Sequence, residues 1–146
     1  MAINSALETL IELATNQTDE AAKRLGRAIR ACEDTEQKLT LLLQYREDYD
    51  MRFKAGMAAG ISAAGYRNFQ LFLEKLDTAI AGQQRIVQDA KHRINDERGA
   101  WQTCERKRMS YDTLATRAQQ AEQRKENKRD QKLTDEYATR QANYKR

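Results

Sequence analysis

The chain contains a long heptad repeat, which runs from Tyr66 to Ala118. Its members follow one another by alternating steps of three and four residues, and nearly all are apolar. They are Tyr66, Phe69, Leu73, Leu76, Ile80, Gln83, Val87, Ala90, Ile94, Glu97, Trp101, Cys104, Arg108, Tyr111, Ala115 and Ala118. A spacing that averages about 3.5 residues places one narrow stripe along a helix, and in a coiled coil a partner helix buries that stripe. This segment therefore needs a second helix.

The N-terminal part of the chain offers a stripe with the same period. Ser5 and Glu8 have the spacing of a capping box, which marks the start of a helix. The row that follows is Leu7, Leu10, Ala14, Gln17, Ala21, Leu25, Ala28, Cys32, Thr35, Leu39, Leu42, Arg46, Tyr49 and Phe53. Two successive four-residue steps around Ala21 predict a stutter, which locally unwinds a supercoil. We expect a helix over about residues 5–55.

A glycine-rich segment without charges separates the two stripes. It contains Gly56, Gly60 and Gly65, and glycine readily adopts the positive φ that ends a helix. This pattern predicts a turn over about residues 56–62, with Ser62 as the N-cap of a second helix over about residues 63–140. Two striped helices joined by a short turn pack antiparallel against each other.

The sequence thus predicts an all-α fold, a long two-helix antiparallel coiled coil, as a single domain over residues 1–146. With a turn near residue 60, residues at one level have numbers that sum to about 121. This register places Phe53 beside Phe69, makes Trp101 a packed core residue, and separates Cys32 from Cys104 too far for a disulfide. The first helix is the shorter one, so at the end away from the turn the second helix overhangs and is unpaired beyond about residue 117.

The composition suits solvated helices better than a round core. Proline is absent, 33% of the residues are charged, and only 7% are aromatic. Residues 98–146 carry 13 basic and 7 acidic side chains, but the two signs are interleaved, which favours a solvated face over a nucleic-acid-binding one. The N-terminus lacks the pattern of a secretory signal and no apolar run is long enough to cross a membrane, so we expect a cytoplasmic protein without membrane insertion.

The sequence contains no recognisable catalytic constellation. The single histidine, His92, has no Cys or second His at the spacing of a metal site. The glycines near residue 60 are not followed by the lysine of a phosphate-binding loop. We therefore expect a protein that is not an enzyme and that binds neither a cofactor nor a metal.

Hydrophobic side chains are in excess near the turn, because one seam needs only two apolar positions per heptad. Three pairs stack as a ladder on one side of the hairpin: Leu42 with Ala79, Tyr45 with Leu76, and Tyr49 with Phe72. This ladder is either a partner-binding patch or a surface for self-association or a local third layer. In the overhang, Leu133, Tyr137 and Tyr144 share one helical face that nothing within the chain covers, which makes them candidates for docking to another protein.

Short motifs along the whole chain resemble the flagellar FliJ family of enterobacterial type. They are Ala6-Leu7-Glu8-Thr9-Leu10, Leu13-Ala14, Tyr45, Tyr49, Glu126-Asn127, Asp130-Gln131-Lys132, Asp135-Glu136-Tyr137-Ala138 and Arg140. The resemblance implies a component of the bacterial flagellar type III export apparatus, which forms a stalk-like antiparallel coiled coil. It also implies binding to the flagellar export ATPase and its regulator, to the cytoplasmic domain of the membrane export gate, and to export chaperones. The expected location is the cytoplasmic side of the inner membrane, in peripheral association with the export apparatus.

The resemblance also assigns two binding surfaces. The export-gate surface matches Leu42, Tyr45, Tyr49, Phe72, Leu76 and Ala79. Its polar border departs from the family pattern, with Lys38 and Gln83 where glutamine and histidine are expected. The ATPase-binding end comprises Leu7, Leu10, Leu13, Asp130, Gln131, Lys132, Leu133, Asp135, Glu136 and Tyr137.

Other hypotheses remain open at this point. A stand-alone coiled-coil chaperone would bind client proteins through the patch near the turn, without an ATPase. A basic helical nucleic-acid binder would lose affinity steeply with salt, although the chain has no groove-docking motif. Self-association into a four-helix bundle is a further alternative to the expected monomer.

Overall fold

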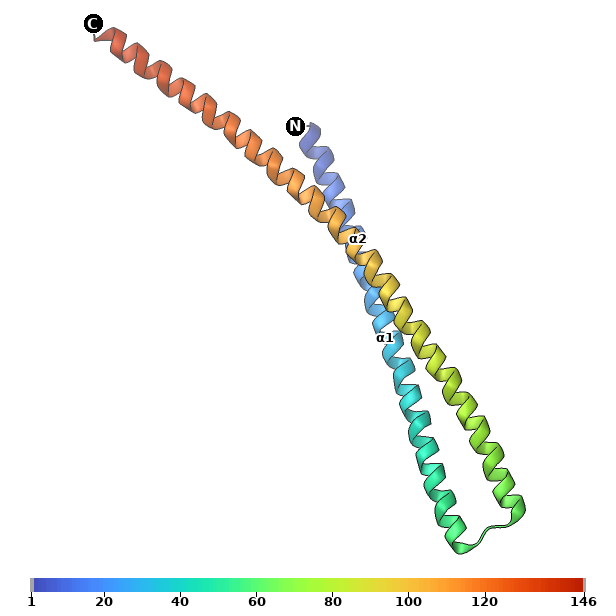
Figure 1. Ribbon diagram of the computed structural model, residues 1–146. Helices are drawn as coiled ribbons and strands as arrows, with labels where there is room; N and C mark the ends of the chain where they lie inside the picture. Colours follow the sequence, from blue (N-terminus) through green and yellow to red (C-terminus); the bar gives the residue numbers. More distant parts are fainter. Residues whose placement is uncertain (1, 146) are drawn as a thin grey trace. The chain divides into compact units, whose positions relative to one another are not determined.

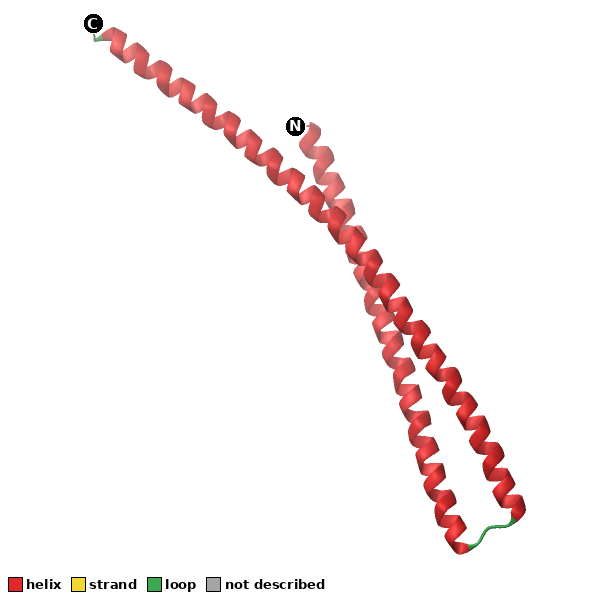
Figure 2. Ribbon diagram, viewed as in Figure 1, coloured by secondary structure: helices red, strands yellow, loops and turns green. Residues whose placement is uncertain are grey.

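A computed structural model of the chain describes residues 2–145, with side chains from Ser5 onward, and this part forms two α-helices and no strand. α1 spans Ala2–Ala59 and α2 spans Ala63–Tyr144 (Figure 2). A loop of residues 60–62 joins them, and from it the two helices run back side by side in opposite directions (Figure 1). The predicted all-α fold, an antiparallel two-helix coiled coil, is confirmed.

The contacts between the helices fall into two units, to which both helices contribute. Unit 1 consists of Met1–Thr18 and Thr103–Arg146, and unit 2 consists of Asp19–Gln102. Each unit is described separately below. That residues 1–146 form a single domain stays a prediction.

The core of unit 2 is a row of apolar side chains from each helix. Ala21, Ala28 and Cys32 of α1 are buried, and so are Phe69, Leu76, Ile80 and Val87 of α2. The rings of Phe53 and Phe69 are stacked with their centroids 3.5 Å apart, as the predicted register requires. Each large apolar side chain removed from water contributes about 1.5–3 kcal/mol, so this seam is the main source of stability in the unit.

Polar side chains within the seam of unit 2 are paired across it. The Gln83 side-chain amide donates a hydrogen bond of 3.0 Å to the Thr35 carbonyl oxygen. The Arg24 guanidinium lies 3.5 Å from the Glu97 carboxylate. Because a partly buried amide or carboxylate without a partner is costly, a shift of one helix along the other would leave these groups unsatisfied. These contacts are therefore consistent with the register that the turn sets.

The start of the α1 row differs from the prediction. Ile11 and Thr18 face α2 in unit 1, whereas Leu10 and Gln17 are exposed. Thr18 is tolerated in the seam because its hydroxyl donates a 2.8 Å hydrogen bond to the Ala14 carbonyl oxygen. The step from Thr18 to Ala21 is three residues, so the expected stutter is absent between positions 7 and 53.

The turn is shorter than predicted, at residues 60–62 rather than about 56–62. α1 continues through Gly56 to Ala59 because the intervening alanines strongly favour a helix. Gly60 then adopts a φ of 92°, and its N–H donates to the Met57 carbonyl oxygen at 3.2 Å. The predicted N-cap is confirmed, since the Ser62 hydroxyl accepts a 3.0 Å hydrogen bond from the N–H of Gly65.

The outer ends of both helices extend beyond the predicted bounds. α1 begins at Ala2, so Ser5 lies inside the helix, where its carbonyl oxygen accepts a hydrogen bond from the Thr9 hydroxyl at 3.0 Å. The capping-box pattern was therefore misleading as a start signal. α2 ends at Tyr144 rather than near residue 140.

Gly56 and Gly60 provide a matched test of the turn. Gly56→Ala should stabilise the protein by up to about 1 kcal/mol, because the position is helical and nothing lies within 4 Å of the added Cβ. Gly60→Ala should destabilise it by about 1–2 kcal/mol, because a side chain disfavours a positive φ. Thermal unfolding followed by circular dichroism measures both, and a Gly60→Ala variant at least as stable as the wild type would contradict the assigned turn.

Candidate protein-interaction surfaces

Aromatic side chains of both helices meet near the turn in unit 2. The Tyr49 ring stacks on Phe69 at a centroid distance of 5.1 Å and lies 4.4 Å from Phe72. The Tyr45 ring lies 6.5 Å from Phe72. Tyr45, Tyr49 and Phe72 are therefore on one side of the hairpin, as the ladder pattern predicted.

The predicted export-gate residues differ in how much surface they present. Tyr45 is 59% exposed, whereas Leu76 is 7% exposed and belongs to the seam. We call the accessible members the tip surface, with Leu76 beneath them. They are Leu42, Tyr45, Tyr49, Phe72 and Ala79, of which Leu42, Tyr49 and Phe72 are half-buried. A protein that bound here would contact half-buried, packed side chains and the exposed ring of Tyr45.

The border of the tip surface includes Lys38 and Gln83. Lys38 is exposed and its charge faces solvent. Gln83 is half-buried, and its amide already donates to Thr35 in the seam. Lys38 is thus the accessible polar group of the two, whereas Gln83 serves the packing of the helices.

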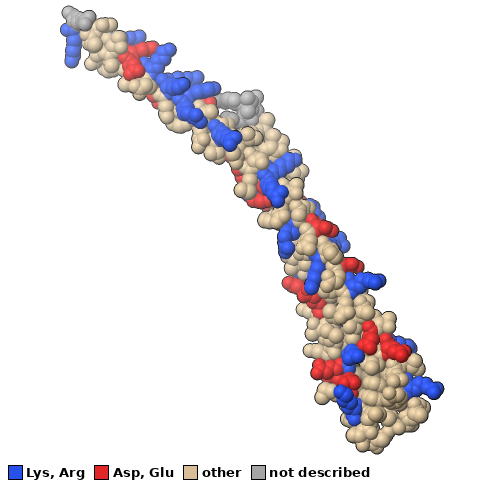
Figure 3. All heavy atoms as spheres, viewed as in Figure 1, with Lys and Arg blue, Asp and Glu red and all other residues tan. Residues whose placement is uncertain are grey.

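Further exposed apolar side chains lie on the turn side of unit 2, and none of them was predicted as a site residue. They are Leu41, Leu43, Met51, Met57, Ile61, Tyr66 and Leu71. Tyr66 was expected in the seam, but it lies at the start of α2, where its ring is 5.8 Å from Phe53 and stays partly open to solvent. The absence of any charged residue from Ala55 to Tyr66 is the sequence signal for Met57, Ile61 and Tyr66. On the face shown in Figure 3, the turn end of unit 2 is correspondingly uncharged.

In unit 1 the helices pair through smaller contacts. Leu7 and Ile11 of α1 and Ala115 and Ala118 of α2 line one shallow hollow, together with Glu8, Gln119 and Glu122. After Ala118 every described residue of α2 is exposed. Beyond this hollow α2 therefore continues as a single helix that no other described residue covers.

The predicted ATPase-binding residues all lie in unit 1. Leu7 is half-buried in the seam, whereas Leu10 and Leu13 are exposed. The others lie on the uncovered part of α2 and are exposed: Asp130, Gln131, Lys132, Leu133, Asp135, Glu136 and Tyr137. Leu133 and Tyr137 are 64% and 66% exposed, because no other described residue covers this end of α2.

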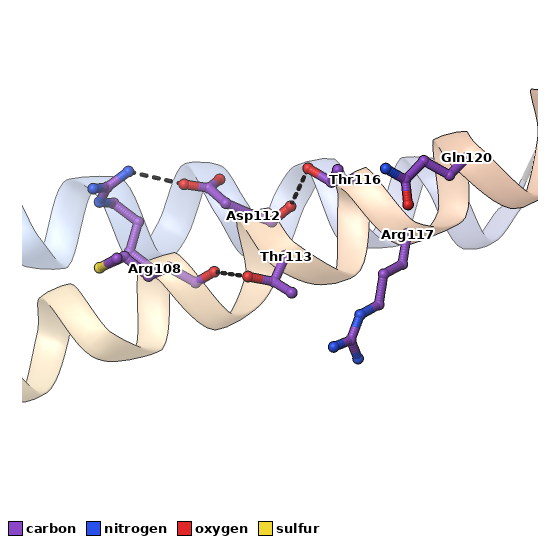
Figure 4. A pocket seen from close by; sticks show the side chains of 7 residues that line it. Arg108, Asp112, Thr113, Thr116, Arg117 and Gln120 are labelled. Atoms are coloured by element: carbon purple, nitrogen blue, oxygen red, sulfur yellow. Dashed lines mark hydrogen bonds and ion pairs between the residues drawn. The ribbon is translucent and has the colours of Figure 1, made fainter.

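Arg108 is the charged member of the unit 1 seam, and carboxylates of its own helix neutralise it. Its guanidinium bonds to Glu105. It also lies 3.0 Å from Asp112, a contact drawn in Figure 4. The hydrogen bonds from Arg108 hold the pKa of Glu105 below its ordinary value of 4.5. Arg108, Thr113 and Thr116 line a second hollow on α2. The hydroxyls of Thr113 and Thr116 donate to backbone carbonyl oxygens of α2, so this second hollow offers no activated nucleophile.

Other kinds of site find little support in the described residues. Both cysteines are free, and burial raises the pKa of the Cys32 thiol, which makes it a poor nucleophile. Residues 2–145 hold no group of three or more His, Cys, Asp or Glu arranged for a metal ion. Over the same residues, neither helix has a stretch apolar enough to span a bilayer.

Comparison with known proteins identifies the family. The model of the family described as flagellar FliJ protein matches residues 3–146. This chain belongs to the FliJ family. The flagellar FliJ protein of Escherichia coli K12 is 31% identical over 142 residues, and that of Salmonella typhi is 32% identical over 142 residues. In both cases the alignment covers 97% of each chain.

Membership of the FliJ family has a consequence for function. The family is a non-enzymatic component of flagellar export, so no catalytic role is assigned to the surfaces described above. The match extends over both units and the uncovered end of α2.

The Glu105–Arg108 pair predicts a pH dependence of stability. Because the pKa of Glu105 is lowered in the folded state, its contribution is complete above the unfolded value of 4.5 and is lost as the pH falls below it. The thermal midpoint of the wild type should therefore fall between about pH 5 and about pH 3, and Glu105→Gln should reduce that fall. If circular dichroism gave parallel curves for the two proteins, the assigned pair would be wrong.

Proposed function

We propose that this FliJ-family chain is a stalk-like coupling subunit of the flagellar type III export apparatus. It binds the export ATPase ring through unit 1, promotes the assembly and activity of the ring, and contacts the cytoplasmic domain of the membrane export gate through the tip surface of unit 2. It also escorts export chaperones. In this role it is located at the cytoplasmic side of the inner membrane, in peripheral association with the export apparatus.

The observation that carries the ATPase assignment is the uncovered end of α2. A single helix in water gains little from its own hydrogen bonds, and most helical stability in proteins comes from packing of an apolar face. Among the described residues, none packs against the C-terminal end of α2, yet this end carries Leu133 and Tyr137 on one face. A ring-shaped partner that encloses this segment would supply the missing contacts.

The observation that supports gate binding is the tip surface. A half-buried aromatic base with a prominent tyrosine matches the composition of binding hot spots, which are enriched in tyrosine and surrounded by weaker contacts. The same surface supports the alternative function, a stand-alone chaperone that binds export clients directly. The two functions differ in whether the export ATPase responds to the chain.

ATP hydrolysis by the purified export ATPase of the same organism tests the proposed function. The full chain should stimulate hydrolysis, whereas a chain that ends at Ala118 and the double variant Leu133→Ser/Tyr137→Ser should stimulate it far less. Met109→Ser is the matched control, because Met109 is also an exposed apolar residue of α2 but precedes the uncovered segment. An ATPase that is active but indifferent to the full chain would contradict the proposal and favour the stand-alone chaperone.

Calorimetric titration of the export-gate cytoplasmic domain tests the second contact. Tyr45→Ser should raise the dissociation constant by about five- to thirtyfold, the loss typical of an interface anchor, and should leave the helical content unchanged because Tyr45 is exposed. Met51→Ser is the control, since Met51 is 63% exposed on the same helix but outside the tip surface. Equal affinities for wild type and Tyr45→Ser would remove the tip surface from the gate contact.

A further inference from the structure

Charges on α2 in unit 1 are segregated around the helix. Successive residues are rotated by about 100°, so the angular position of each side chain follows from its number. Between Thr103 and Lys128, apart from the seam residue Arg108, the basic residues fall within one arc of about 100°. We call them the basic arc: Arg106, Lys107, Arg117, Arg124, Lys125 and Lys128. The acidic residues of this segment fall within a separate arc of similar width: Glu105, Asp112, Glu122 and Glu126.

The basic arc is not neutralised within the protein. In the described part of the chain its six members make no ion pair, whereas Arg108 of the seam is held by Glu105 and Asp112. On the face drawn in Figure 3, Lys and Arg side chains gather along the C-terminal part of α2. The positive potential of this arc is therefore available to attract a negatively charged partner.

Exposed leucines accompany the basic arc. Leu114 is 50% exposed and falls at an angle inside the arc, and Leu10 and Leu13 of α1 are 41% and 53% exposed. Glu8 and Gln119 share the hollow on one flank of unit 1. On α1, Leu10 and Glu8 lie on opposite sides of the seam row. On α2, Leu114 and Gln119 likewise lie on opposite sides of the seam row. Both leucines are therefore on the flank of unit 1 that faces away from this hollow. We call Leu10, Leu13 and Leu114 the leucine flank.

We propose that the leucine flank and the basic arc together dock against an acidic protein surface with an apolar centre, on the export ATPase ring. This inference rests on the proposed function. It specifies which face of unit 1 makes the contact and which kinds of side chain the partner surface presents. Apolar contact by the leucines holds the two surfaces together, and the lysines and arginines select carboxylates and accelerate the encounter.

Other occupants fit the observations less well. A second copy of the chain placed face to face would bring one basic arc against another, which is repulsive. Nucleic acid would use the basic arc but not the leucines. Three leucines at the junction of two helices are a small area for insertion into a bilayer, where binding strength scales with the apolar area buried.

The deciding experiment measures binding of the full-length chain to the purified export ATPase at low and at high salt. Charge reversal with Arg117→Glu/Arg124→Glu/Lys128→Glu should weaken binding at least about tenfold at low salt, mainly by slowing association, and should flatten the salt dependence. Leu114→Ser should weaken binding at both salt concentrations. The matched controls are Glu122→Lys/Glu126→Lys, which changes charge on the opposite arc, and Met109→Ser; neither should weaken binding.

The outcomes separate this inference from the proposed function. If the wild type binds, Leu133→Ser/Tyr137→Ser abolishes binding, and the basic-arc and Leu114 variants bind normally, then the inference is wrong and the proposed function stands. If the wild type does not bind an active ATPase, both are wrong. Phosphatidylglycerol vesicles and a DNA duplex are tested in parallel. Binding to either at physiological salt that the charge reversal removes, with ATPase binding intact, would overturn the inference in favour of that ligand.

Discussion

Apolar packing at alternating third and fourth positions holds the two helices together, and the other features of the structure depend on it. Helices of 58 and 82 residues have no other large source of stability, since the buried core consists of single rows such as Ala21, Ala28, Phe69, Ile80 and Val87. The row alone would tolerate a shift by one heptad. The short loop of residues 60–62 removes that freedom, and the half-buried Gln83–Thr35 hydrogen bond and the partly exposed Arg24–Glu97 pair fit the register that the loop sets.

The seam also determines which surfaces remain for partners. Near the turn, Tyr49 and Phe72 close the seam from one side, and Tyr45 is left exposed above them. In unit 1 the first helix is the shorter partner, and α2 after Ala118 has no cover. The chain belongs to the FliJ family, and we expect it to act through such surfaces. In our proposal the basic arc and the leucine flank determine which face of unit 1 meets the partner.

Much of this fold is predictable from sequence, because heptad periodicity records helix pairing directly. The α2 row was predicted through Ala118, and the register that places Phe53 against Phe69 followed from the turn. At the start of α1 the pattern was ambiguous, since Leu10 and Ile11 are both apolar, and the structure buries Ile11 with Thr18. The Thr18 hydroxyl hydrogen-bonds to a backbone carbonyl oxygen of its own helix, and the heptad pattern of apolar residues does not reveal such a bond. The glycines placed the turn only approximately, because only the φ of Gly60 identifies the glycine that ends α1. The assigned binding surfaces stay predictions, although Leu76 proves to be a seam residue.

Amide hydrogen exchange of the full chain, alone and with the export ATPase, tests the central claim most directly, namely that intramolecular pairing ends near Ala118 and leaves the rest of α2 for a partner. The account predicts slow exchange through the paired seam and rapid exchange after Ala118 in the free chain, because a helix without packing opens readily. Addition of the ATPase should protect residues 119–144. Strong protection of that segment in the free chain, or no change on addition of an ATPase that binds, would contradict the account.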